Sequence, residues 1–502
     1  MIEIEGKYTT AIVQGLEEEQ LEDGAREQIQ EMTNHEAFVN DIRVMPDVHV
    51  GKGSVIGFTM PVADKIIPNV IGVDIGCGML AVRLSGVSDE LRTDDGLDHE
   101  EIDQRVRGRV PIGWGQAGVK APDREYHNVH EEMDYGELDS RLEQFVETVG
   151  LDYTEPMREF LDNGGYDLDF FKGLVENRAK QMSYHFDMNT AINQFGTLGS
   201  GNHFIELAKS EQTGDLWVVI HSGSRKLGSN TAEYWQQQAI DIEAIHSDWR
   251  AERVSEAREV LEEYPTEYVK FDVDAVTDKE MLNWLQGGMG EDFVNYDAIP
   301  PEEREDVRKE LKRVVPEADD PPEVNVDESL DYLTGEEAGG YLLDMLFCQQ
   351  YAVKNRLLMA RGVADVLGAS IEDEIHSIHN FIDFRDGIIR KGSTRAYDGE
   401  LGVVPFNMQA GTLIVEGKGN KDWNWSVCHG AGRVMSRREA ERTFTEDEIR
   451  AQMDDVDAYA SELPLDEAPN AYKDVTFVEN AITETADVVD RLNVVHNFKA
   501  GD

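Results

Sequence analysis

An aspartate and a cysteine stand three residues apart in a glycine-flanked segment near the N-terminus, VIGVDIGCGM. Asp74 and Cys77 follow an apolar run, which favours a strand that ends in a tight turn and directs polar side chains into a cleft. A carboxylate and a thiolate together can bind a borderline-soft divalent metal ion, and a thiolate can bridge two ions. A lone cysteine at a strand end is more often simply buried, so this pair alone is a weak indication.

Three histidines in later segments strengthen the metal-site interpretation. His203 follows a Gly-rich turn in GTLGSGNHFIEL, His221 closes the apolar run in LWVVIHSGSR, and His379 lies in EIHSIHNFIDF. Neutral imidazole is the commonest metal ligand among protein side chains. His376 is a rival ligand, and any one of these histidines alone would more simply be a hydrogen-bonded structural residue. One cysteine, one aspartate and three histidines would suit two metal ions that share the thiolate.

A further histidine, His429, lies in the loop of WSVCHGAGRVMSRREA. The backbone N–H groups of Gly430, Ala431 and Gly432 can approach a phosphate closely, while Arg433 and Arg437 offset its charge. Such a histidine can act as a nucleophile that forms a phosphoramidate. The surrounding residues 385–442 hold ten Lys or Arg and seven Asp or Glu, a local charge of +3. A basic stretch in an acidic protein is where we expect a polyanion to bind.

Acidic residues dominate the composition of this 502-residue chain. Asp and Glu number 101 against 47 Lys and Arg, a formal charge of −54, yet 40% of the residues are hydrophobic and can form a core. This apolar content argues against disorder. An acidic, solvated shell suits a cell with molar salt inside, because salt screens the self-repulsion. We therefore expect a halophilic protein.

The cysteines and the hydropathy pattern indicate a cellular compartment. The three cysteines, Cys77, Cys348 and Cys428, have no CxxC spacing and are too few for a disulfide framework, which indicates a reducing environment. The sequence has neither a signal-peptide pattern nor an uninterrupted run of about 18 apolar residues. We expect a cytoplasmic protein that does not enter a membrane.

The N-terminal half is expected to alternate between helices, strands and acidic segments. Residues 11–31 favour a helix, and residues 40–84, rich in Val, Ile, Gly and Pro, favour strands and loops. The stretches from about 120 to 195 and from about 250 to 325 are dense in Asp and Glu. These two stretches are interpreted as solvated helices and acidic surface insertions.

The C-terminal half is expected to begin with a long helix. Residues 340–367 mix apolar and polar residues without proline, which predicts that helix. A β-rich stretch over 371–417 follows and ends in a Gly-rich loop. Thr445 and Glu448 have the spacing of a capping box, so a helix is expected to start there. The candidate motifs extend from position 45 to 440, which favours one interwoven catalytic domain.

These motifs, in this order, closely resemble those of the RtcB family of RNA ligases, also called tRNA-splicing ligases. The matching blocks cover nearly the whole chain: MPDVHVGKG, GVDIGCGM, GTLGSGNHFIEL, HSGSR, HN at 379–380, RKGSTRA and HGAGRVMSR. The resemblance implies a single large α/β domain of the RtcB type over residues 1–502. That fold is unrelated to the fold of the standard nucleotidyltransferases.

The resemblance also implies a metal centre with two Mn2+ ions bridged by Cys77. Asp74 and His203 would complete the ligands of one ion, and His221 and His379 those of the other. The metal ions would bring phosphate oxygens and the nucleophile together and neutralise developing charge.

The implied reaction is GTP-dependent RNA ligation in tRNA splicing or RNA repair. His429 would attack the α-phosphate of GTP, release pyrophosphate and carry GMP. The GMP would pass to an RNA 3′-phosphate, and a 5′-hydroxyl would displace it to form the phosphodiester. A 2′,3′-cyclic phosphate end would first be opened to the 3′-phosphate. The expected partners are such RNA ends, tRNA halves among them, and a small activating protein of the archease type.

The guanylate-binding residues implied by the resemblance include two departures from the family pattern. Where the family has Pro-Gly-Ser-Met-Gly, this chain has Pro405 to Gln409, and Thr412 stands where Ser is frequent; losing both glycines is expected to alter the approach of the backbone to the nucleotide. The C-terminal lysine that contacts guanine corresponds to Lys499, followed here by Ala500 and Gly501. The implied set is Asn202, Glu206, Asn380, Pro405, Phe406, Asn407, Met408, Thr412, His429, Gly430, Ala431, Gly432 and Lys499.

Two other functions compete with the ligase. One is a two-metal phosphatase or cyclic phosphodiesterase that acts on RNA ends, in which the altered loop no longer supports guanylylation. The other is a catalytically silent RNA-binding paralogue, which the presence of all the expected metal ligands and His429 disfavours.

Overall fold

The computed structural model describes residues 1–94, 96–113, 129–183, 185–240 and 329–500, and short pieces between residues 240 and 329. Contacts along the chain divide it into two compact units, Met1–Ala239 with Asp327–Asp502, and Ile240–Val326. All the motifs described above lie in the first unit. The single domain over 1–502 stays a prediction, and the acidic stretch 250–325 lies almost entirely outside the described residues.

The centre of the first unit is a mixed sheet of eight strands. Seven of them follow the order β10-β5-β9-β8-β18-β15-β14, with all neighbours antiparallel, and β17 pairs in parallel with β18. In this register His221 lies opposite both Met79 and Phe204. The strands are β5 (Gly78–Leu84), β8 (Phe204–Ser210), β9 (Leu216–Ser222), β10 (Ile371–Ile378), β14 (Leu401–Pro405), β15 (Thr412–Gly417), β17 (Tyr459–Ala460) and β18 (Ala486–Phe498).

A second sheet of six strands contains the N-terminus. Its order is β1-β2-β3-β4-β12-β11, and His379 lies between β10 of the first sheet and β11 of the second. Two small sheets pair β13 (Ser393–Arg395) with β16 (Ser426–Cys428) and β6 (Arg92–Thr93) with β7 (Gly96–Leu97). The strands of the second sheet are β1 (Ile2–Glu5), β2 (Thr10–Val13), β3 (Ile42–His49), β4 (Ile56–Pro61), β11 (Asn380–Ile382) and β12 (Ile388–Lys391).

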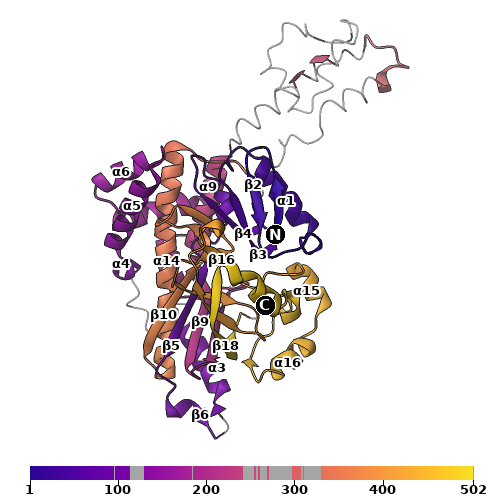
Figure 1. The fold of residues 1–502 in the computed structure, drawn as a ribbon. Helices are drawn as coiled ribbons and strands as arrows, with labels where there is room; N and C mark the ends of the chain where they lie inside the picture. Colours follow the sequence, from indigo (N-terminus) through magenta and orange to yellow (C-terminus); the bar gives the residue numbers. More distant parts are fainter. Residues whose placement is uncertain are drawn as a thin grey trace. The chain divides into compact units, whose positions relative to one another are not determined.

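One long helix, α14 (Gly335–Leu367), supports the eight-stranded sheet. It packs on β5 and β9 on one side and on α5 (Tyr135–Val149) and α6 (Thr154–Asp162) on the other (Figure 1). Most of its side chains are buried, as expected of a helix that is covered all round. The helix predicted over 340–367 is therefore confirmed.

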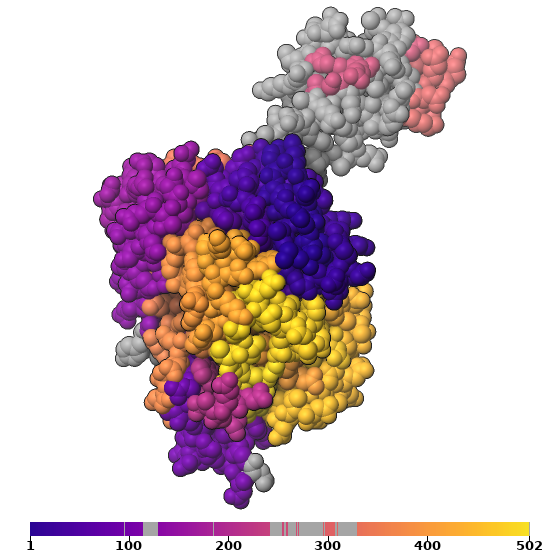
Figure 2. Space-filling view, viewed as in Figure 1, coloured from indigo at the N-terminus to yellow at the C-terminus, as the bar shows by residue number. Residues whose placement is uncertain are grey.

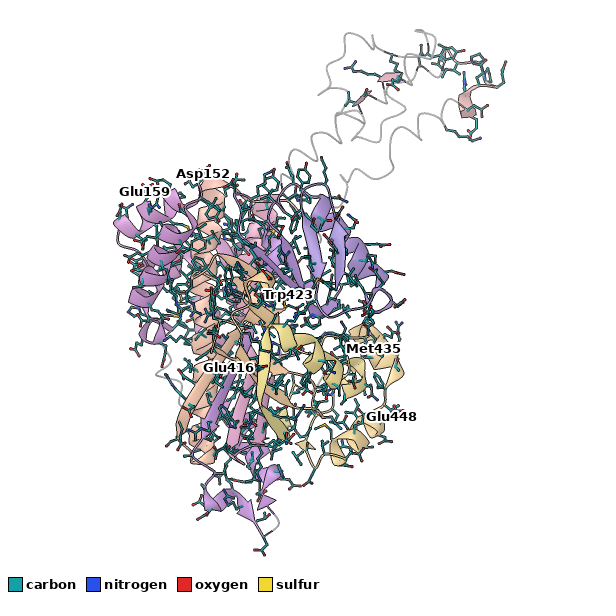
Figure 3. The ribbon with its side chains drawn as sticks, viewed as in Figure 1. Asp152, Glu159, Glu416, Trp423, Met435 and Glu448 are labelled. Carbon is teal, nitrogen blue, oxygen red and sulfur yellow. The ribbon has the colours of Figure 1, made fainter. Side chains whose placement is uncertain are left out.

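The shorter helices of the first unit pack on the sheets, on α14 or on one another. Helix α5 buries Leu138, Leu142 and Phe145 in the core and leaves its acidic residues outside. The acidic residues Asp152, Glu159, Glu416 and Glu448, labelled in Figure 3, are likewise exposed. In the described part of the first unit the other α-helices are α1 (Asp23–Asn34), α2 (Pro68–Ile71), α3 (His99–Arg109), α4 (Val129–Glu132), α7 (Leu168–Gly173), α8 (Met188–Gln194), α9 (Arg225–Ala239), α15 (Arg437–Thr443), α16 (Glu446–Asp454) and α17 (Val475–Ala481).

The fold class and most of the predicted elements are confirmed, and one predicted helix is corrected at its start. The protein is a mixed α/β protein, and Thr445 forms the predicted capping box with Glu448 at the start of α16. The helix predicted over 11–31 is wrong at its start, because residues up to Val13 pair in the sheet as β2 and α1 begins at Asp23. The acidic stretch 120–195 does contain helices from Val129 onward; their origin as an insertion stays a prediction.

The N-terminal and C-terminal parts of the chain meet on one face of the first unit (Figure 2). Lys473, just before α17, donates hydrogen bonds from Nζ to the carbonyl oxygens of Pro46 and Val48, at 3.0 and 2.8 Å. These bonds fix strand β3 against the C-terminal segment. The strand thereby holds Asp47 and His49 in place.

Candidate active site

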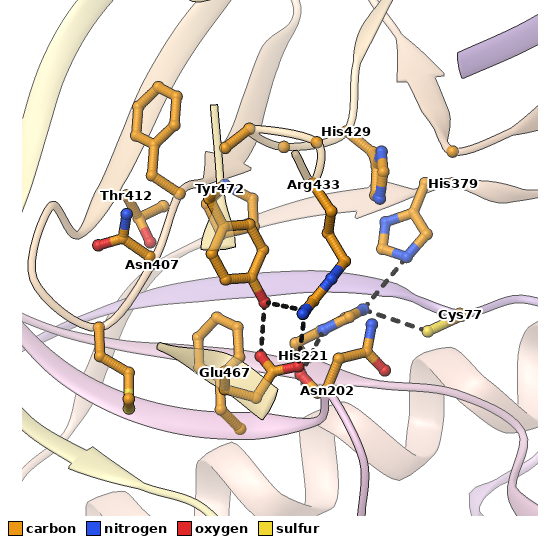
Figure 4. A pocket seen from close by; sticks show the side chains of 18 of the residues that line it. Cys77, Asn202, His221, His379, Asn407, Thr412, His429, Arg433, Glu467 and Tyr472 are labelled. Carbon is orange, nitrogen blue, oxygen red and sulfur yellow. Dashed lines mark hydrogen bonds and ion pairs between the residues drawn. The ribbon is translucent and has the colours of Figure 1, made fainter. Parts of the chain in front are cut away.

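A cavity of about 320 Å³ opens where the two sheets and the C-terminal segment meet (Figure 4). All the residues predicted to hold a guanylate line it, and so do four of the five predicted metal ligands; His203 lies behind them. Residues not predicted to line it are His49, Ile56, Phe204, Gly392, Gly411, Glu467, Tyr472 and Asn497. The structure therefore brings together residues from segments more than 400 positions apart.

The predicted metal ligands lie together at one end of this cavity. Cys77 Sγ lies 3.3 Å from His221 Nε2 and 3.6 Å from His203 Nε2. The ligand atoms of these three residues all lie within 4.8 Å of one another. We call the set of Asp74, Cys77, His203, His221 and His379 the Cys77 cluster: Asp74 Oδ2 is 3.0 Å from His203 Nε2, and the Nε2 atoms of His221 and His379 are 3.2 Å apart.

The local backbone explains how Asp74 and Cys77 reach the cluster. The Cys77 N–H donates to the Asp74 carbonyl at 3.1 Å and closes a tight turn with Gly76 at a φ of 72°. A Cβ on Gly76 would lie 2.8 Å from the Cα of Gln349 in α14, so only glycine fits. The expectation that this turn ends a strand is wrong, because the preceding apolar run forms α2 and the turn leads into β5.

Hydrogen bonds to the backbone select the imidazole tautomers in the cluster. Nδ1 of His203 lies 3.0 Å from the Leu198 carbonyl, and Nδ1 of His221 lies 3.1 Å from the Asn202 carbonyl. A carbonyl only accepts, so both Nδ1 atoms carry the proton and both Nε2 atoms present a lone pair to the cluster. Arg225 Nη1 is also 3.3 Å from Nδ1 of His203, but the carbonyl is nearer.

This arrangement fits a metal ion. Lone pairs of two imidazoles face a sulfur and a carboxylate at 3.0 to 3.6 Å, a repulsive arrangement unless a cation or proton lies between them. Burial lowers the pKa of His221 and His379 well below the usual value, so both rings are neutral ligands. Burial raises the pKa of the Cys77 thiol, so a thiolate there requires a nearby cation. The buried Cys77, His203 and His221 are thus a possible metal site, and the role of each residue stays a prediction.

Helix α14 holds the loops of the cluster in place through two consecutive buried residues. Asn355 Oδ1 accepts from the N–H groups of Gly196 and Thr197, at 2.6 and 3.1 Å. Arg356 Nη1 donates to the carbonyls of Gly76 and Ser222, at 3.0 and 2.6 Å. The segments that carry Cys77, His203 and His221 are therefore tied to one helix.

His429 lies beside the cluster at the cavity wall. Its Nδ1 is 2.7 Å from Oδ2 of Asp47, which is completely buried, and its ring centroid is 4.8 Å from that of His379 (Figure 4). The carboxylate orients the ring and keeps the proton on Nδ1, which leaves the Nε2 lone pair free. Gly432 has a φ of 71°, and a Cβ there would lie 2.4 Å from the Asp47 carbonyl, so the glycine permits this close approach.

The altered loop, Phe406 to Gln409, lies at the far end of the cavity and is held in its turn by the side chain of Asn407. Oδ1 of Asn407 accepts from the N–H groups of Gln409 and Ala410, at 3.0 and 2.9 Å. Neither Phe406 nor Gln409, the residues at the two glycine positions, has a positive φ, so this loop does not use the conformational freedom that glycines would give there. The effect on nucleotide binding stays a prediction.

A buried carboxylate, Glu467, organises the cations near this loop. Its Oε2 accepts from Lys499 Nζ at 2.6 Å and from the Tyr472 hydroxyl at 2.7 Å, and its Oε1 lies 3.3 and 3.4 Å from Arg437 and Arg433. Burial opposes ionisation, but the neighbouring Lys499 and Arg437 charges lower the pKa of Glu467 to about 2. The sequence did not single out Glu467, which is one acidic residue among 101.

A second carboxylate in the cavity, Glu206, has the opposite pKa shift. Asn497 Nδ2 donates to its Oε2 at 3.1 Å, while its buried Oε1 has no hydrogen-bond partner among the residues that the structure describes. Burial raises the pKa of Glu206 to about 8, so the group is protonated at neutral pH.

Two other sequence expectations have different outcomes. His376 lies outside the cluster and the cavity; its Nε2 is 3.7 Å from Glu374 Oε1, in a separate groove. In the basic window, Arg390 is buried against Asp383 and Asp386, and Arg395 pairs with Asp383 and Glu400. These two arginines are neutralised within the fold and do not line the cavity, whereas Arg433 and Arg437 line it and pair there with Glu467.

The chain is similar to known proteins over most of its length. The family described as tRNA-splicing ligase RtcB matches residues 28–274 and 309–500. The chain is 26% identical to the RNA-splicing ligase RtcB of Escherichia coli K12, over 95% of this chain and 94% of that protein. It is 25% identical to the tRNA-splicing ligase RtcB of Nanoarchaeum equitans over 87% and 83%, and 26% identical to that of Aeropyrum pernix over 86% and 82%. No helix in the described part of the chain is long and apolar enough to cross a membrane. Because the family match covers most of its length, the chain belongs to the RtcB family of tRNA-splicing ligases.

Proposed function

We propose that this protein is a GTP- and Mn2+-dependent RNA ligase that joins RNA 3′-phosphate or 2′,3′-cyclic phosphate ends to 5′-hydroxyl ends. Family membership supports an RNA ligase. The observation that carries the finer proposal is His429, oriented by the buried Asp47 and placed next to the Cys77 cluster in the cavity wall.

The metal ions would be held by the Cys77 cluster. Asp74, Cys77 and His203 would bind one ion, and Cys77, His221 and His379 the other. When bound, they would neutralise charge on phosphate oxygens. Asn355 and Arg356 would keep the loops of the cluster at the spacing that binding requires.

His429 would be the nucleophile. Its Nε2 lone pair attacks the α-phosphorus of GTP, a nitrogen–phosphorus bond forms, and pyrophosphate leaves. The Asp47 carboxylate stabilises the positive charge that the ring gains. The N–H groups of Gly430 to Gly432 and the cations of Arg433 and Arg437 would bind phosphate oxygens.

The guanosine would occupy the end of the cavity lined by Glu206, Phe406, Asn407, Thr412 and Lys499. In the later steps GMP passes to the RNA 3′-phosphate and is displaced by the 5′-hydroxyl. Intron-bearing tRNA halves or damaged RNA would supply such ends, and an archease-type protein would assist. The cell would be a halophile, with the enzyme in its cytoplasm.

Incubation with α-32P-GTP and Mn2+ tests the proposal. A labelled protein band that is acid-labile and alkali-stable is expected from a histidine adduct, together with joining of RNA ends. Turnover of 2′,3′-cyclic ends without a labelled band would instead identify a two-metal phosphatase or cyclic phosphodiesterase. The altered loop at Phe406 to Gln409 is the feature that makes this alternative worth testing.

A further inference from the structure

A second imidazole, His49, shares its anchor with His429. His49 Nδ1 lies 2.9 Å from the carbonyl oxygen of Asp47, while the carboxylate of the same residue lies 2.7 Å from His429 Nδ1. The carbonyl only accepts, so Nδ1 of His49 carries the proton and Nε2 presents a lone pair. His49 lines the cavity, and its Nε2 has no hydrogen-bond partner among the described residues.

The reaction proposed above needs a group of this kind at one step. The attack of His429 on GTP uses a free lone pair, and pyrophosphate leaves as an anion. With an RNA 3′-phosphate as substrate, only the attack of the 5′-hydroxyl breaks an O–H bond of the nucleophile. A positioned base that takes this proton accelerates such a step by about 10² to 10⁴.

The other titratable groups of the cavity are already engaged. Of its four imidazoles among the described residues, His221 faces Cys77, His379 faces His221, and His429 is the proposed nucleophile. Glu467 is held by Lys499 and Tyr472, and Asp74 lies against His203. Glu206 is protonated at neutral pH, since burial raises its pKa to about 8. His49 remains.

We propose that His49 is the general base of the joining step, and this inference rests on the proposed ligase function. The 5′-hydroxyl oxygen forms a bond to the phosphorus of the guanylylated 3′-phosphate, and its proton passes to His49 Nε2. The bond between that phosphorus and the bridging oxygen of GMP breaks. GMP leaves with the electron pair as a dianion, which balances the charge of the imidazolium.

The surroundings of His49 fit a base that works beside phosphates. Burial lowers its pKa to about 4, so Nε2 is unprotonated before substrate arrives. The groups that face it are Asp47 on the same strand, His429 and Lys473. Anionic phosphates bound next to the ring would raise the pKa toward neutrality, where a general base is most effective.

The test separates the two steps. His49→Asn keeps a donor near the Asp47 carbonyl and removes the base at Nε2; His49→Ala leaves room for added imidazole. Labelling with α-32P-GTP reports the first step. Single-turnover joining of an RNA end that already carries the 3′-guanylate, to a 5′-hydroxyl strand, reports the last. His376→Asn is the matched control, because burial also lowers the pKa of His376 to about 4 and it lies outside the cavity.

We expect His49→Asn to be labelled within about threefold of the wild-type rate and to join at least about 100-fold more slowly. Imidazole should restore joining by His49→Ala, and the acidic limb of the pH profile for joining should disappear in both variants. Unchanged joining, or an equal fall in both steps without imidazole rescue, overturns the assignment. A wild-type protein that is not labelled refutes the ligase proposal itself, and the inference with it.

Discussion

Replacing Asp47 by Asn removes one charge from the site while keeping the size of the side chain. The His429 ring gains positive charge when Nε2 bonds to phosphorus, and Asp47 Oδ2 lies 2.7 Å from its Nδ1. A hydrogen bond to a charged group contributes about 1.5 to 3 kcal/mol. At about 1.36 kcal/mol per tenfold change in rate, its loss slows guanylylation roughly 10- to 160-fold.

A second effect adds to this loss. If the Asn side chain directs its amide NH2 group toward the ring, Nδ1 of His429 must accept a hydrogen bond from it. The ring proton then moves from Nδ1 to Nε2. Nε2 then has no lone pair for attack. In Ser-His-Asp enzymes the same replacement costs on the order of 10⁴ in rate for this reason. We therefore expect a fall of at least roughly 100-fold in Asp47→Asn.

The assay is the initial rate of GMP adduct formation with α-32P-GTP, with metal content measured in the same sample. Asp41→Asn is the matched control, since Asp41 lies directly before β3 and its side chain is 73% exposed. Surface substitutions change stability by about 0.5 kcal/mol or less, so we expect the control rate to stay within about twofold. If the Asp47→Asn variant keeps its metal and forms the adduct at a rate within about threefold of wild type, the orienting role of this carboxylate is refuted.

Four further outcomes are expected. Cys77→Ala should lose bound metal and guanylylation, whereas Cys348→Ala, a buried thiol that contacts Thr231, should keep both; equal metal content in the two variants would contradict the shared-ligand assignment. His429→Ala should bind metal and form no adduct, yet still join RNA that carries a 3′-guanylate; a labelled variant would place the nucleophile elsewhere. Because burial raises the pKa of Glu206 to about 8 from an unfolded value near 4.5, the folded state binds the extra proton, and stability falls as pH rises between these values. Glu206→Gln should remove that part of the pH dependence of stability. If the melting temperatures of the two proteins change in the same way from pH 5 to about 9, this explanation is contradicted. Activity and circular dichroism should both increase as KCl rises from about 0.1 to 3 M, since the Debye length falls to about 3 Å at 1 M; an intact fold at low salt with steadily falling activity would contradict the halophile prediction.

The components of the Cys77 cluster could be predicted because each one combines a ligand residue with a local signal. Cys77 and His203 follow Gly-rich turns, and His221 closes an apolar strand. The long helix was predictable for a similar reason, since residues 340–367 mix apolar and polar residues and contain no proline that would interrupt a helix. Patterns of this kind can be interpreted from the sequence because they act on the local backbone conformation and do not depend on distant residues.

Other parts of the site depend on contacts between distant segments. Asp47 and His49 stand in a motif that the sequence does single out, but their partner His429 lies 382 residues from Asp47. Glu467 differs from the exposed acidic residues only in being buried, which no local pattern indicates. The helix expected over 11–31 failed because pairing with β3 outweighs the helix propensity of the first few residues.

The place of the last strand has a consequence for biosynthesis. Strand β18, residues 486–498, lies inside the eight-stranded sheet between β8 and β15. Until those residues leave the ribosome, β8 and β15 present unpaired backbone edges, which are sites of misassembly. At about 5 to 20 residues per second, synthesis of the chain takes roughly 25 to 100 s. The nascent protein therefore has an open sheet until β18 emerges, and Lys499, which follows this strand, joins the cavity only after that.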